Sequence, residues 1–218
     1  LPSAGSAKSM DFDGTDDAVD TGFQPDFIHT NATMAYWVNM DDLSGAQLCG
    51  THNGKRFYLG FYNATAGMGV QDQNNLGIGA SLSSLIAVNQ WHHIAMVADG
   101  GTATFYLDGV ARDTMSYTQN SANNPVANLY IGAKSNSGTY DDFINGSIDE
   151  FAVWDAALDG DAIRALYNAG LPTPVTTKTG AYDIYRDNLK AYYKMGDATN
   201  PAADGTSSRV NTHLFDQT

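Results

Sequence analysis

Residues 90–112 read QWHHIAMVADGGTATFYLDGVAR, and they indicate the fold class more clearly than any other part of the chain. Two runs rich in β-branched and aromatic residues, 90–98 and 102–107, flank the turn residues Asp99, Gly100 and Gly101. A second turn at Asp108 and Gly109 leads into a third short run at 110–112. Strand, tight turn, strand and tight turn is the pattern of an antiparallel meander.

The same pattern extends in both directions from this stretch. Further strands are predicted at 33–40, 56–62, 67–71, 128–132 and 146–154. Many short strands with regular turns predict an all-β fold, a two-sheet antiparallel β-sandwich of the jelly-roll type. One short C-terminal helix is predicted at 159–168, with Asp159 as its cap, Ile163, Leu166 and Tyr167 on its apolar face, and Gly170 near its end.

The charge and the hydrophobic pattern of the sequence argue against two classes of protein, nucleic-acid-binding and membrane-inserted proteins. The 218 residues carry 24 acidic and 11 basic side chains, for a net charge of -13. This charge argues against nucleic-acid partners, which need clustered Lys and Arg. No apolar run approaches the ~20 residues of a membrane span, so no membrane insertion is expected. The first residues, LPSAGSAKS, also lack the apolar core of a signal peptide.

Seven motifs together resemble the laminin-G-like family of concanavalin A-like jelly rolls. In order along the chain they are FDGTDD at 12–17, ATMAYWV at 32–38, NQWHHIAMV at 89–97, FYLDG at 105–109, LYIG at 129–132, GSIDEFAVWD at 146–155 and LYNAG at 166–170. The resemblance implies a sandwich over residues 1–170, a frequent bound calcium, and mostly non-catalytic roles in glycan binding, adhesion or assembly.

Residues 171–218 differ in composition from the predicted sandwich. Residues 171–187 read as a linker by composition, and 188–218 form a strand-containing tail. This tail is similar to the segment between tandem jelly-roll repeats of phage virion and bacterial surface proteins. Residues 188–195 are therefore predicted to supply an edge strand, either folded back on their own domain or added to a neighbour's sheet for self-assembly. A simple boundary within a longer repeat protein is the alternative.

An acidic stretch, DFDGTDDAVD at 11–20, is the candidate metal site. Asp13, Asp16 and Asp17 surround a turn at Gly14, and calcium is bound by six to eight such hard oxygens. In the family that this chain resembles, calcium commonly ties the first strand to the last long strand, where Asp149 matches. The predicted site is thus Asp13, Gly14, Asp16, Asp17 and Asp149; a solvated acidic turn is the alternative. Two further acidic pairs, Asp41 with Asp42 and Asp141 with Asp142, could join a site but are expected to face water.

Catalytic patterns are not found. Retaining glycosidases of this fold class place two acids on one face of a strand, but positions 147, 149 and 151 read Ser, Asp and Phe. Cys49 near His52 is better explained as a buried small residue than as a nucleophile. His92 and His93 are neighbours on a strand and point to opposite faces, so they cannot chelate one ion.

These observations predict a non-catalytic, calcium-stabilised recognition or assembly module on a virion or cell surface. Its expected partners are glycans or surface proteins, and its expected location is extracellular or on the virion. Tyr58, Tyr62, Tyr117 and Tyr140 are the candidate aromatic contacts for a sugar. The alternative function is a carbohydrate-binding module of a larger glycan-active enzyme.

Overall fold

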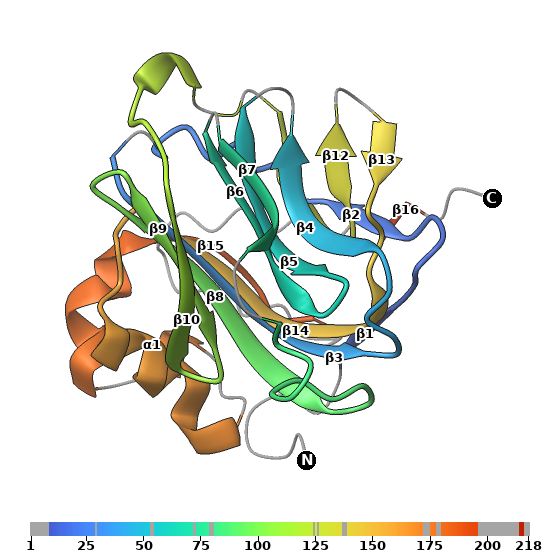
Figure 1. Ribbon diagram of the computed structural model, residues 1–218. Helices are drawn as coiled ribbons and strands as arrows, with labels where there is room; N and C mark the ends of the chain where they lie inside the picture. The colour runs from blue at the N-terminus through green and yellow to red at the C-terminus, as the bar shows by residue number, and fades with distance from the viewer. Residues whose placement is uncertain are drawn as a thin grey trace.

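The computed structural model confirms the two-sheet sandwich (Figure 1). It describes residues 9–28, 30–52, 55–71, 73–78, 81–123, 125, 127–136, 139–171, 175–177, 180–195 and 214–215. A seven-stranded sheet has the order β1-β14-β3-β8-β9-β10, with β15 also paired to β14, and a six-stranded sheet has the order β13-β12-β4-β5-β6-β7. A small third sheet joins β11, β2 and β16. The described pairs are antiparallel, apart from the parallel pairing of β12 with β4.

The seven-stranded sheet consists of β1 (Met10–Asp13), β14 (Asn145–Trp154), β3 (Ala32–Met40), β8 (Trp91–Asp99), β9 (Thr102–Leu107), β10 (Val110–Ser116) and β15 (Leu189–Tyr193). The six-stranded sheet consists of β13 (Thr139–Asp141), β12 (Lys134–Asn136), β4 (Ala46–His52), β5 (Arg56–Tyr62), β6 (Thr65–Gln71) and β7 (Gln73–Ile78). The small sheet contains β11 (Tyr130–Ile131), β2 (Ala18–Asp20) and β16 (Leu214–Phe215). The meander predicted from residues 90–112 is β8, β9 and β10.

The main core lies between the two large sheets. Alternate residues of each strand face inward, as the period of two in a strand requires. On β5 these inward residues are Phe57, Leu59 and Phe61, all part of the main apolar cluster. The opposite face of β5 therefore carries Arg56, Tyr58, Gly60 and Tyr62, and this outer face becomes important below.

A second apolar cluster covers the outside of the seven-stranded sheet. Helix α1 (Gly160–Tyr167) packs there, and Figure 1 shows it with the helical segments that follow on one side of that sheet. Asp159 caps the helix as predicted, accepting a hydrogen bond from the Ala162 amide at 2.8 Å. The helix ends at Tyr167, and its C-cap Asn168 takes the left-handed conformation, close to the predicted end at 168.

The segment predicted as a linker packs on this cluster in its described parts. It contains two 3-10 helices, η3 (Val175–Thr177) and η4 (Gly180–Asn188). Tyr182 is fully buried, and its hydroxyl accepts a hydrogen bond from Trp154 Nε1 at 3.0 Å. The composition of this segment predicted a linker because turn residues outnumber apolar ones. The segment packs on the domain instead, because Tyr182 buries its ring and bonds to Trp154.

The predicted edge strand folds back on its own domain. Strand β15 pairs with residues 151–154 of β14, and β1 pairs with residues 145–148 of the same strand edge. Both run antiparallel to β14, so these two strands lie in line along one edge. Residues 196–213 and 216–218 of the predicted tail lie outside the described residues.

Candidate functional site

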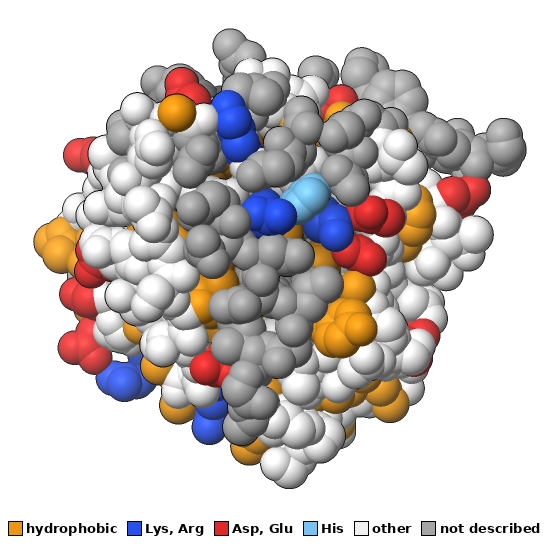
Figure 2. Space-filling model, turned by 45° about the horizontal axis from the view of Figure 1, so that its top comes forward, with side chains coloured by type: hydrophobic (Ala, Val, Ile, Leu, Met, Phe, Trp, Pro, Cys, Tyr) orange, Lys and Arg blue, Asp and Glu red, His pale blue; other side chains and the backbone are white. Residues whose placement is uncertain are grey.

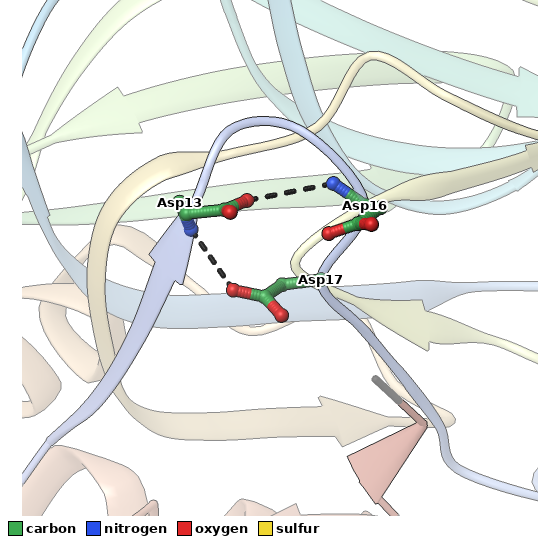
Figure 3. A group of neighbouring side chains, drawn as sticks. All are labelled: Asp13, Asp16 and Asp17. Atoms are coloured by element: carbon green, nitrogen blue, oxygen red, sulfur yellow. Dashed lines mark hydrogen bonds between the residues drawn. The ribbon is translucent and has the colours of Figure 1, made fainter. Parts of the chain in front are cut away.

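The acidic turn between β1 and β2 holds the predicted metal-binding residues. Asp13, Asp16 and Asp17 each offer a carboxylate oxygen, and these oxygens lie within 4.8 Å of one another. Figure 3 shows the three side chains grouped at the turn. The turn is also held by its own acids: the Thr15 amide donates to Asp13 Oδ1 at 2.8 Å, and the Asp13 amide donates to Asp17 Oδ2 at 3.0 Å.

A polar network beneath the turn fixes its position. Gly14 has a φ of +76°, and a Cβ there would lie 2.7 Å from the Cβ of Asn145, so only glycine fits. The Asn145 side chain donates to Asp42 Oδ2 at 2.8 Å. Asp42 Oδ1 accepts from Gln47 Nε2 at 3.0 Å and from the Ser44 amide at 2.8 Å. Asp42, expected to face water, is thus the centre of a support for the turn.

The structure corrects the placement of Asp149. The end of β1 lies beside Asn145, because Asp13 pairs with that residue in the sheet register. Asp149 is four residues further along β14, a separation of ~13 Å at the usual rise of a strand. It is 2% exposed and sits at a β-bulge together with Glu150. The resemblance assigned Asp149 to the same strand correctly but not to the same end of it.

The carboxylates of Asp13, Asp16 and Asp17 remain at the turn, and their oxygens are suitable ligands for a hard cation. Three carboxylates with oxygens within 4.8 Å supply the ligand type that calcium prefers. The two carboxylate oxygens that accept amide hydrogen bonds keep further lone pairs for a metal. Asp13, Asp16 and Asp17 could therefore bind calcium, with the backbone at Gly14 as an additional oxygen source. Asp149 does not fit such a site.

A second candidate site lies on the outer face of the six-stranded sheet; the sequence named Tyr58 as a candidate contact but did not show which residues surround it. In the register, Lys134 of β12 pairs with Gly50, Gly50 with Tyr58, and Tyr58 with Gly69. A Cβ at Gly69 would lie 2.4 Å from the Tyr58 ring, so the ring lies over that glycine. The Tyr58 side chain therefore uses the space that the neighbouring strands leave empty.

The Tyr58 hydroxyl is an unusual polar group. Tyr58 is 0% exposed, and its hydroxyl has no hydrogen-bond partner among the residues that the structure describes. Burial raises the pKa of Tyr58, so the group stays neutral and keeps its proton to donate. Buried polar groups without partners are rare and call for an explanation.

Polar and charged side chains lie near this tyrosine, and we call this set the polar cluster: Lys134, Asp141, Asp142, His52 and Arg56. Lys134 Nζ lies 5.4 Å from the centre of the Tyr58 ring, 3.4 Å from Asp141 Oδ1, and in contact with Asp142 Oδ2. The His52 ring centre is 6.5 Å from that of Tyr58. Figure 2 shows a histidine with Lys or Arg and Asp or Glu side chains next to one another on one face of the molecule. The cluster offers both donors and acceptors.

The other predicted sugar contacts are placed less favourably. Tyr117 is 6% exposed and belongs to the core. Tyr62 is 36% exposed on the same outer face as Tyr58, at the far end of β5. Tyr140 is half-buried and packs edge-on against Tyr130, with ring centres 5.0 Å apart. Two of the four candidate aromatics are therefore buried.

The residues considered as catalytic candidates, Cys49, His92 and His93, take part in packing and hydrogen bonds within the fold. Cys49 faces the core, and burial raises the pKa of its thiol to about 12. His92 accepts a hydrogen bond from the Ala87 amide through Nε2 and contacts Asp108 Oδ2 through Nδ1 at 2.8 Å. His93 lies against Trp37 on the opposite face of β8, as the alternation predicted.

Comparisons with known proteins agree with the fold. A laminin G family model, described as the concanavalin A-like lectin/glucanases superfamily, matches residues 13–164. The chain therefore belongs to this superfamily. A search of curated proteins finds no match.

Solved structures show the same fold at low sequence identity. A protein from Bacteroides ovatus, provisionally described as carbohydrate-binding, is 16% identical with a TM-score of 0.57, over 88% of this chain and 52% of that one. The NanB sialidase of Streptococcus pneumoniae, as its K499G mutant, is 15% identical with a TM-score of 0.57, over 72% of this chain and 27% of the sialidase. The CBM40 of a Ruminococcus gnavus sialidase, bound to α2,3-sialyllactose, is 15% identical with a TM-score of 0.52, over 75% of this chain and 100% of that module. The chain thus spans about half of the first protein and about a quarter of the second.

Within the described parts of the chain, no helix has the length and apolarity to cross a lipid bilayer.

Proposed function

We propose that the chain is a non-catalytic glycan-recognition module that acts on a cell or virion surface. Its superfamily and the carbohydrate-binding descriptions of similar structures support this role. A module of a larger glycan-active enzyme is the second candidate, because the chain matches only part of a sialidase. Both candidates bind glycans; hydrolysis of a bound glycan by the native full-length protein would distinguish the second.

The observation that carries the proposal is the Tyr58 hydroxyl. It is buried beneath the polar cluster and unused by the described protein. A sugar hydroxyl that reached it would accept a hydrogen bond from the Tyr58 hydroxyl, while the carboxylates of Asp141 and Asp142 would accept hydrogen bonds from other sugar hydroxyls. Binding sites commonly combine such a few convergent polar groups with an apolar floor.

The test is Tyr58→Phe, measured by glycan array and by titration with the strongest hit. Losing one hydrogen bond should weaken binding by roughly two- to twelve-fold, from ~0.5–1.5 kcal/mol. Stability should stay equal or rise, because the variant removes an unsatisfied buried group. Tyr106→Phe, on the other large sheet, is the matched control and should bind normally. Equal binding by both variants would refute a role for this hydroxyl.

We further propose calcium at the acidic turn, held by Asp13, Asp16, Asp17 and the backbone near Gly14. The ion would neutralise three carboxylates that otherwise repel one another. At about a hundred times its dissociation constant it would add ~2.7 kcal/mol of stability. That corresponds to a rise in melting temperature of roughly 5–11 °C. Asp16→Asn should abolish the rise and Asp161→Asn, on α1, should keep it; equal melts in calcium and chelator would leave a solvated turn.

Self-assembly through residues 188–195 is a further proposal. Because β15 and β1 share one edge of β14, a second copy could donate its β15 to that edge instead. Tyr192 and Tyr193 are more than nine-tenths buried there, so an edge without β15 would expose the surface that these two side chains cover. Size-exclusion chromatography over a concentration series tests this, and a monomer at all concentrations would contradict it.

A further inference from the structure

We infer that the polar cluster selects neutral sugars over anionic ones, and that Asp141 and Asp142 set this selectivity. The inference rests on the proposed glycan-binding function and adds a ligand class to it. It differs from what structural likeness alone would suggest, since one similar module is bound to a sialylated sugar.

The first step is the local charge at the cluster. Lys134 is its most buried cation, at 8% exposure, and two carboxylates surround its ammonium group. The side chains of Asp141 and Asp142 are 43% and 22% exposed, against 10% for that of Lys134. An incoming ligand therefore meets carboxylate oxygens before it meets the ammonium group.

The second step is the chemistry of those oxygens. An ionised carboxylate only accepts hydrogen bonds, and the hydroxyls of a neutral sugar can donate them. The carboxylate of a sialic or uronic acid cannot donate, and it would lie beside two charges of its own sign. The cluster thus matches the hydrogen-bonding capacity of a neutral sugar and repels an acidic one.

The third step is the remaining charge. Arg56 adds one cation, so among the described members of the cluster two cations accompany two carboxylates. Burial raises the pKa of Tyr58; among the charges of the cluster, Arg56 lowers it, and Asp142 and Asp141 raise it. At long range the protein carries a net charge of -13, which slows the approach of anionic ligands.

The test compares neutral ligands with acidic counterparts, namely lactose with α2,3-sialyllactose and galactan with galacturonan oligomers. The wild-type chain should prefer the neutral member of whichever pair it binds. In Asp141→Asn/Asp142→Asn the ammonium group of Lys134 is no longer neutralised, and the neutral-to-acidic affinity ratio should fall about tenfold. Asp141→Asn alone changes the more exposed of the two carboxylates, so it should disturb the fold less, and the ratio should fall about threefold.

The control is Asp161→Asn/Asp183→Asn. These two aspartates also pair with cations, Arg164 and Arg186, both at 2.8 Å, and the double variant changes the net charge by the same amount. It should leave the affinity ratio unchanged, which separates local selectivity from overall charge.

Preference of the wild type for the acidic members would overturn the inference while leaving glycan binding intact. Equal shifts in the two double variants would also overturn it, because overall charge would then explain the effect. Absence of binding to every glycan on the array would refute the proposed function itself, and the inference with it.

Discussion

Replacing Asp42 with alanine should destabilise the protein strongly, whereas the same change at the neighbouring Asp41 should have little effect. Its carboxylate accepts hydrogen bonds from the Ser44 amide and hydroxyl at 2.8 and 2.7 Å, from Gln47 Nε2 at 3.0 Å, and from Asn145 Nδ2 at 2.8 Å. Hydrogen bonds to a charged group are worth ~1.5–3 kcal/mol each. The site is partly exposed and water replaces some donors, so we expect a net loss of about 2–4 kcal/mol.

Thermal or urea unfolding measures this loss, which corresponds to a fall in melting temperature of roughly 5–15 °C. Asp41→Ala is the matched control. The Asp41 side chain is exposed, so its removal should change the free energy of unfolding by no more than about 0.5 kcal/mol. Equal effects of the two substitutions would refute the assignment of Asp42 as the support of the acidic turn.

The same carboxylate predicts a pH dependence. Hydrogen bonds from Asn145 and Ser44 lower the pKa of Asp42 below its usual value. A depressed folded-state pKa adds stability above the unfolded-state pKa of about 3.9, and this stability is lost as the pH falls through the folded value. The stability difference between the wild type and Asp42→Asn should therefore be constant from pH 7 to about 5 and shrink below about pH 4. A difference that stays constant down to pH 2 would contradict this account.

Three further predictions concern packing and helix ends. Cys49 should not react with a thiol reagent at pH 8 in the native protein, because burial raises its pKa to about 12, and it should react fully in urea. Asp159→Ala should cost about 1 kcal/mol in urea unfolding, because the Ala162 amide loses its capping partner. Tyr182→Phe should cost about 1–3 kcal/mol in the same assay, because the buried Trp154 indole N–H is left without its acceptor.

Local signals in the sequence predicted the parts of the fold that local chemistry determines. The β8–β9–β10 meander follows from turn residues beside each strand, and the start of α1 follows from the capping side chain of Asp159. Strand β4 was missed because Gln47 and Thr51 interrupt its apolar pattern at inward positions. The partners that make Gln47 tolerable there, Asp42 and Asn145, include one that is 98 residues away.

In the candidate sites, too, the sequence predicted what neighbouring residues determine and not what long-range contacts determine. The acidic turn was visible because Asp13, Asp16 and Asp17 are neighbours in the chain. The position of Asp149 depended on the register of β1 against β14, which no short stretch of sequence contains. Tyr58 was recognised as a candidate contact, but its buried site depends on Gly50 and Gly69 from two other strands.

The short segment from Asp142 to Asn145, between β13 and β14, connects both candidate sites to the beginning of β4. At its start, the backbone carbonyl of Asp142 accepts from the Leu48 amide at 2.8 Å, while its side chain contacts Lys134 of the polar cluster. At its end, the Asn145 amide donates to Gln47 Oε1 at 2.8 Å, while its side chain packs under the acidic turn. Both contacts are made to the beginning of β4. A change in this support, such as Asp42→Ala, should therefore weaken calcium and glycan binding together, whereas Asp16→Asn and Tyr58→Phe should each affect only their own site.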